Sequence, residues 1–277
     1  MRSKGLRSTT VLIFGLSLSA LVCAQPARAA DNEYDGDWHF TLTPYVWLPG
    51  VSGDLRYKAP RGFSGNAEVH VGAEDIFEDL KFAFMGTGSV RRGNWSVFTD
   101  FIYLDLGSDN AKVKDIVGPG GIVEFPVSLS TKSGLDGFVW TAAAAYSFFH
   151  DNVSSADAFV GFRGLGLSSS LDWQFANPPL LFPQSGHLEQ YQQLWDGLIG
   201  VRGRFGFSGS HWFIPYYADI GTGQSNFTAQ ALAGAGYAFS WGDLSLVYRY
   251  LYYEPGQDKL INNMSVHGPA FGATFHF

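Results

Sequence analysis

Apolar and polar residues alternate along much of this chain, and the alternation is longest in its last third. Between 194 and 207, one parity holds Trp195 and Phe205, whereas the other holds Asp196 and Arg202. Successive side chains of a strand point to opposite faces, so one face is apolar and the other polar. Such a run spans roughly 45 Å at about 3.3 Å per residue, which is long for a soluble strand. The pattern predicts a strand of a transmembrane β-barrel, with lipid outside and a polar lumen.

The same alternation predicts an all-β fold of antiparallel strands. The predicted strands are 38–47, 82–92, 95–106, 137–149, 156–169 and 194–207, followed by four more between turns at 208–210, 222–225, 242–243 and 255–263. The links at 93–94, 150–155, 208–210 and 242–243 are short, and those at 49–81, 107–133, 170–189, 222–225 and 255–263 are longer. Short periplasmic turns and longer outer loops are typical of bacterial barrels, so we predict an antiparallel transmembrane β-barrel of ten strands.

Two features of the first long link leave alternatives open. The runs 53–58 and 67–71 could pair as a hairpin, which would give twelve strands. Residues 74–80 have apolar positions spaced like one helical turn, which could enter or cap the lumen. A soluble periplasmic β-sandwich is the rival fold, and it would require the apolar faces to pack on each other.

The amino terminus has the organisation of a secretory signal peptide. Arg2, Lys4 and Arg7 precede an apolar stretch at 10–24, and the small residues at 27–29 fit a cleavage site. We therefore divide the chain into a signal peptide at 1–29 and an outer-membrane barrel domain at 30–277. The apolar stretch is shorter than the ~20 residues of a membrane-spanning helix.

Composition narrows the function classes. Cleavage would remove four basic residues, and the remaining 14 basic and 25 acidic residues give a net charge of −11. Such a charge argues against nucleic-acid binding. The only cysteine would leave with the signal peptide, and the seven histidines are scattered without ligand spacing. We therefore expect no metal and no cofactor.

Tryptophans recur where the predicted strands meet the short turns. These residues are Trp38, Trp95, Trp212 and Trp241. Trp and Tyr prefer the level of lipid headgroups, so we interpret the four as an aromatic girdle at the periplasmic side.

Several stretches resemble a family of uncharacterised outer-membrane β-barrel proteins of Gram-negative bacteria. They are PYVW at 44–47, GNW at 93–95, TDFIYLDL at 99–106, YADIG at 217–221, YRY at 248–250 and GPAFG at 268–272 through to the terminal phenylalanine. The resemblance covers nearly the whole chain after the signal peptide and implies an architecture in the outer membrane, without an activity to transfer. Alternating Phe271, Phe275 and Phe277 look like the signal that the barrel-assembly machinery reads. Outer-membrane lipid and this machinery are thus the expected partners, and the oligomeric state stays open.

Inward positions are where selectivity or chemistry would lie. By alternation the lumen-lining candidates are Asp100, Arg163, Asp196, Arg202, Arg204, Asp219 and Arg249. Because unpaired charges in a confined lumen are costly, a mixed-sign network that fills it is the leading interpretation. The functional version is a narrow, weakly selective pore in which the four arginines favour a small anionic solute.

Two other function classes are open to such a barrel. A lipid hydrolase would need a nucleophile and base, and Ser265, His267 and Glu254 are the only suggestive set. There is no nucleophile elbow, so we expect no enzyme and no catalytic residue. The other class is a barrel that anchors or contacts a partner through its outer loops at 107–133 and 170–189.

Overall fold

A computed structural model of the chain describes residues 33–59, 63–108, 129–175, 185–255 and 261–277. The predicted signal peptide lies outside these residues. The described part is all-β apart from one short helix, α1 (Ala73–Glu78). No helix in it is long and apolar enough to cross a membrane. The strands are β1 (Trp38–Trp47), β2 (Gly50–Ala59), β3 (Phe63–Val71), β4 (Leu80–Arg92), β5 (Trp95–Ser108), β6 (Leu129–His150), β7 (Ser155–Phe175), β8 (Ser185–Gly206), β9 (Trp212–Gly223), β10 (Ser225–Phe239), β11 (Gly242–Pro255) and β12 (Ile261–His276).

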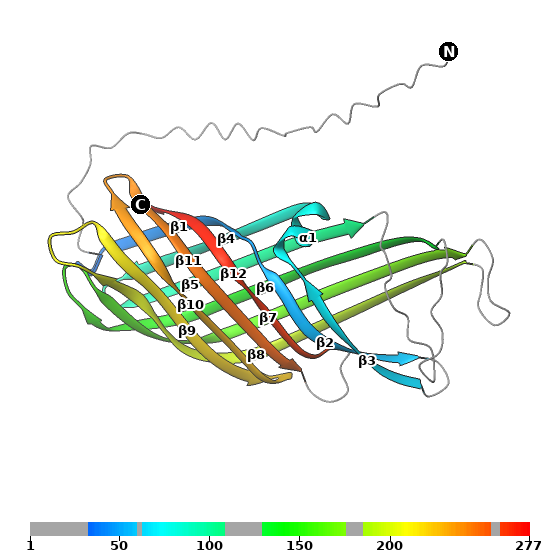
Figure 1. Cartoon of the computed structure of the whole chain (residues 1–277). Coiled ribbons are helices and arrows are strands. Elements are labelled where there is room, and N and C mark those ends of the chain that lie inside the picture. The colour runs from blue at the N-terminus through cyan, green and yellow to red at the C-terminus, as the bar shows by residue number, and fades with distance from the viewer. Residues whose placement is uncertain (1–32, 60–62, 109–128, 176–184, 256–260) are drawn as a thin grey trace, which may run out of the picture.

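Ten of these strands form a closed antiparallel barrel. From β4 to β12 each strand pairs with the next, and β1 joins the two ends by pairing with both β4 and β12. Reciprocal backbone hydrogen bonds between Phe40 and Phe277, of 3.0 and 2.9 Å, close the seam. Figure 1 places the start of β1 and the carboxy terminus at the same end as the short turns. The ten-strand prediction is confirmed, and β2 and β3 stand outside the ring as an added hairpin.

This hairpin continues the wall of the barrel at the long-loop end. Strand β1 pairs with β12 as far as Trp47, which lies opposite Ala270. Strand β2 continues on β12 in the same register, with Gly50 opposite His267. Strand β3 then folds back on the free edge of β2. The pairing between β1 and β4 ends at Pro44 opposite Gly86, and α1 lies in the chain between β3 and β4. The predicted hairpin and helical turn are both present, but the hairpin adds no strand to the ten-strand ring, and the place of the helical turn in or over the lumen stays a prediction.

Three strands are longer than the alternation predicted. Strands β6, β7 and β8 contain 22, 21 and 22 residues. Each therefore runs for roughly 70 Å at about 3.3 Å per residue. Residues 107–108 and 129–133 of the first predicted loop, and 170–175 and 185–189 of the second, are strand, which corrects those loop boundaries. The rest of both predicted loops, at 109–128 and 176–184, lies outside the described residues.

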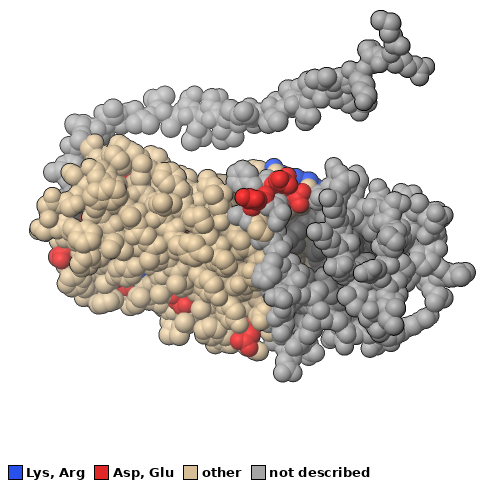
Figure 2. Space-filling model, viewed as in Figure 1, with Lys and Arg blue, Asp and Glu red and all other residues tan. Residues whose placement is uncertain are grey.

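The outside of the barrel carries an apolar band near the short turns. On β5 the outward residues are apolar or aromatic from Trp95 to Tyr103, apart from Thr99, and Asp105 follows. Figure 2 shows the described surface around the short-turn end almost free of charged atoms. The four tryptophans of the predicted girdle lie at this end and are 50–64 % exposed. A band of this kind, edged by aromatic rings, fits a lipid surround.

The short turns have local reasons for their shape. Gly93 adopts a φ of 56°, which only glycine takes without strain, and Gly93–Asn94 joins β4 to β5 in two residues. In the next short turn, the Asp151 carboxylate accepts hydrogen bonds from the backbone amides of Val153 and Ser154. These two bonds hold the pKa of Asp151 below its ordinary value of 3.8.

Candidate functional site in the lumen

The first group of charges inside the barrel gathers around Asp157 on β7. Its carboxylate lies 2.5 Å from Arg91 and 3.5 Å from Arg202. The Arg202 guanidinium is 3.9 Å from the centre of the Phe98 ring and donates to the Ser96 hydroxyl at 3.2 Å. Strand alternation places all five side chains on the inner face, and pairing of opposite charges offsets the cost of their burial.

Arg249 on β11 is the centre of a second group. Its guanidinium donates to Asp100 at 2.7 Å, Gln230 at 2.9 Å and the Tyr45 hydroxyl at 2.9 Å. Tyr45 and Thr87 each donate to the same Asp100 oxygen at 2.8 Å. Residues from five strands thus meet on one arginine–aspartate pair across the barrel.

Arg163 on β7 is the centre of the third group and is completely buried. It forms a hydrogen-bonded ion pair with Asp219, and it also donates to Thr141 at 3.2 Å and Thr228 at 3.4 Å. Tyr217 donates to the paired Asp219 oxygen at 2.5 Å. Both charged side chains have no exposed surface, so neither is available to a solute in this arrangement.

The two remaining lumen candidates lie at different heights. Arg204 reaches Asp243 at 3.3 Å near the short-turn end, where His276 also contacts this aspartate at 3.1 Å. Asp196 has no arginine partner among the described residues. It is 1 % exposed and accepts a hydrogen bond from the Ser225 backbone amide at 2.7 Å.

The structure therefore places all seven predicted lumen residues on the inner face and brings six of them into ion pairs. Strand alternation identified which side chains point inward, but not their partners. Arg91, Asp157 and Asp243 complete the set, and the network holds five arginines against five aspartates. Their formal charges cancel, so the arginines do not form a positively charged path by themselves.

An apolar layer also crosses the lumen, and this feature was missed in the sequence. It is a cluster of inward side chains from eight strands: Trp47, Met85, Ile102, Val139, Leu165, Leu194, Leu251, Tyr253 and Ala270. Each is at most 9 % exposed. The sequence did carry a signal for this layer. On β5, β7 and β11, the next inward residue after Asp100, Arg163 and Arg249 is apolar.

A cavity of about 260 Å³ lies inside the barrel between two charged groups. Arg202 and Phe98 line it on one side, and Asp100 and Arg249 line it on the other. Two buried polar atoms of the network, Arg249 Nε beside this cavity and Asp219 Oδ1 in the third group, have no protein partner among the described residues. Atoms of this kind are normally satisfied by internal water.

The suggested hydrolase residues do not form a nucleophile–base pair among the described contacts. The His267 ring is hydrogen-bonded to the Tyr248 hydroxyl at 2.8 Å and stacks against Tyr250. Ser265 instead donates to the Ser52 carbonyl at 3.4 Å. Within the part of the chain that is described, no three His, Cys, Asp or Glu side chains gather as a metal site would require.

Comparison with solved structures finds bacterial outer-membrane barrels at very low identity. Outer membrane protease OmpT from Escherichia coli is 8 % identical, with a TM-score of 0.49, covering 91 % of this chain and 100 % of that one. The attachment invasion locus protein Ail of Yersinia pestis is 10 % identical, with a TM-score of 0.34, covering 87 % and 98 %. The transport unit of the autotransporter AIDA-I from Escherichia coli is 10 % identical, with a TM-score of 0.34, covering 90 % and 93 %. No family model and no curated protein sequence matches the chain.

Proposed function

We propose that this protein is an integral outer-membrane barrel whose lumen is closed to solutes, and that it serves as a structural support for its own outer extension. The observation that carries this proposal is the apolar layer from Trp47 to Ala270 across the lumen. Ions passing such a layer would lose their hydration without gaining polar partners, which is costly. The paired charges below it add further occlusion.

The membrane location rests on the outer face of the barrel. An apolar band with exposed tryptophans at one edge would be unfavourable in water, whereas a closed barrel leaves no unpaired edge within lipid. The short turns then lie in the periplasm and the long strands point outward.

The outer extension is the part of the protein that could meet a partner. On β6 the exterior turns polar at Asp136, and seven further residues of this strand continue to Leu129. Strand β8 likewise extends beyond Gln193 to Ser185. A sheet held this far beyond the apolar band needs a rigid base, and a filled barrel provides one.

Conductance in a planar lipid bilayer tests the closed lumen. The folded protein should give no discrete current steps, while a conducting porin in the same bilayer gives them. Folding is established separately by resistance of the barrel to protease.

The second candidate is a narrow pore, favoured by the internal cavity of about 260 Å³. Reproducible steps from the folded protein would support it and refute the closed lumen. Anion selectivity of those steps, lost on neutralising Arg202, would assign the selectivity to the arginines.

A further inference from the structure

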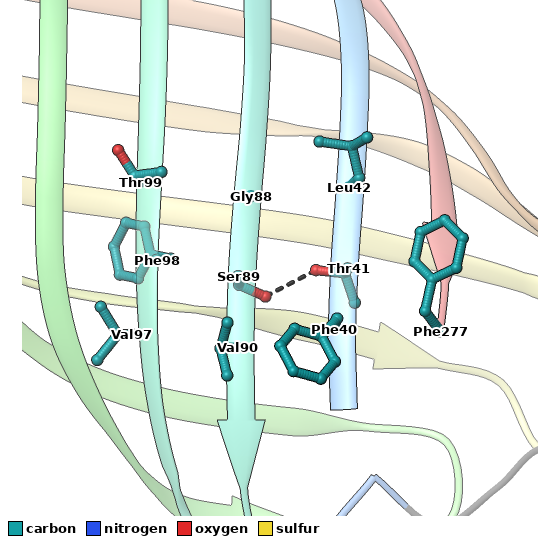
Figure 3. Close-up of a pocket in the computed structure, with 10 residues that line it drawn as sticks. All are labelled: Phe40, Thr41, Leu42, Gly88, Ser89, Val90, Val97, Phe98, Thr99 and Phe277. Carbon is teal, nitrogen blue, oxygen red and sulfur yellow. Dashed lines mark hydrogen bonds between the residues drawn. The ribbon is translucent and has the colours of Figure 1, made fainter. Parts of the chain in front are cut away.

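The outer face of the barrel has a groove close to the periplasmic girdle. Its volume is about 340 Å³, and it lies over β1, β4 and β5 beside the carboxy terminus. Figure 3 shows Gly88 between Leu42 and Thr99, with no side chain to fill the space between them. A Cβ atom added at Gly88 would meet nothing closer than 3.9 Å. The groove therefore exists because glycine stands at an outward position.

The lining of the groove suits a hydrocarbon chain. Its outward apolar side chains are Phe40, Leu42, Val90, Val97 and Phe277, whereas the Phe98 side chain points into the lumen. The Thr41 and Ser89 side chains have the opposite parity and face inward, where their hydroxyls are hydrogen-bonded to each other at 2.7 Å. The Thr99 hydroxyl donates to the Thr141 carbonyl and accepts from the Trp140 indole. Because the Thr99 hydroxyl is already hydrogen-bonded, the groove offers a bound molecule apolar contact and no free polar partner among the described residues.

A positive charge stands at the next register position towards the periplasm. Arg92 lies between Trp38 on β1 and Trp95 on β5, both outward. Its guanidinium lies 5.4 Å from the Trp38 ring centre, and its Nε donates to the Gly36 carbonyl at 3.1 Å. No other hydrogen bond to described residues involves it, and the Arg92 side chain is exposed. The other arginines of the ten barrel strands belong to the lumen network.

We propose that this face binds one glycerophospholipid of the periplasmic leaflet, with an acyl chain in the groove over Gly88 and the phosphate on Arg92. The inference rests on the proposed membrane location. An arginine offers paired N–H donors that match a phosphate, and the neighbouring tryptophans lie at the level where headgroups lie. The Arg92 charge thus fits the phosphate of one amphipathic molecule, and the apolar groove fits its acyl chain.

Native mass spectrometry of the delipidated full protein in detergent tests the site, with dioleoyl phosphatidylglycerol as the probe. The wild-type protein should bind one molecule of this added phosphatidylglycerol. Arg92→Gln should weaken this binding about tenfold, because a charge-assisted contact is lost. Gly88→Leu should remove it by filling the groove. Gly197→Leu is the matched control, since Gly197 is also an outward strand glycine with open space, on β8.

Dioleoylglycerol separates the two parts of the site. Lacking a phosphate, it should bind more weakly and should not respond to Arg92→Gln. Equal occupancy by phosphatidylglycerol in the wild type and in Arg92→Gln would overturn the proposal, as would equal loss in Gly88→Leu and Gly197→Leu. If Gly88→Leu fails to fold, the exposed Arg92 variant decides alone. Insertion into vesicles, measured by protease protection, reports on the membrane location independently of lipid occupancy.

Discussion

Replacing Arg163 by Met tests whether the lumen is closed to bulk water. The arginine is fully buried, and its partner Asp219 has no exposed side-chain surface. Removing one member of a buried ion pair typically costs 3–5 kcal/mol, because the other charge stays buried without its counterion. Tyr217 would keep its 2.5 Å hydrogen bond to Asp219, so we expect about 3 kcal/mol, the lower end of this range.

The same pair in an open, water-filled channel would behave differently. Solvated ion pairs contribute roughly 0–1 kcal/mol, so the variant would then be nearly neutral. The size of the loss therefore distinguishes a closed lumen from a pore without any measurement of current.

The assay is equilibrium unfolding by urea in lipid vesicles, followed by tryptophan fluorescence. Arg204→Met is the control, because the Arg204 side chain is 36 % exposed and lies 3.3 Å from Asp243 at the solvated end. It should lose less than about 1 kcal/mol. Replacing both Arg163 and Asp219 by apolar residues should recover most of the stability. A loss below about 1 kcal/mol for Arg163→Met would refute the closed lumen.

Three further results are expected. Leu194→Ala, in the apolar layer, should cost about 2–5 kcal/mol of unfolding free energy, whereas Leu246→Ala on the exposed outer face should cost far less; equal losses would contradict the layer as a packed core. Deleting Phe277 removes both backbone hydrogen bonds to Phe40, so assembly into vesicles should slow and the heat-resistant band on gels should weaken; unchanged kinetics would argue against a role at the seam. Because its pKa is lowered, the contribution of Asp151 to its turn should be present at neutral pH and disappear as pH falls below 3.8; an NMR titration midpoint above 3.8 would contradict this.

Alternation by itself determined the barrel. Side chains of a strand switch faces at every residue, so the inward positions of Asp100, Arg163 and Arg249 follow from parity without any knowledge of their neighbours. The lengths of the links also predicted ten strands, because short and long links must lie at opposite ends of an up-and-down barrel. Both properties depend only on residues close together in the chain.

Strand ends were harder to predict for a physical reason. Beyond the apolar band a strand is bordered by water or by other protein, and the contrast between its two faces fades. The residues that extend β6 and β8 include many Ser, Gly and Gln. Their composition predicts a loop, although neighbouring strands pair with them. Their strand structure comes from ladder hydrogen bonds between segments far apart in the sequence.

The partners across the lumen were decided only by the tertiary structure. Arg163 and Asp219 are 56 residues apart, and Arg249 and Asp100 are 149 apart. Which arginine meets which aspartate depends on the combined stagger of all the intervening strands, and a local sequence pattern does not reveal that combined stagger. The same stagger brings Trp47, Leu194 and Leu251 together in one buried apolar cluster. The sequence thus determined which residues face inward, and the closed ring determined which of them meet.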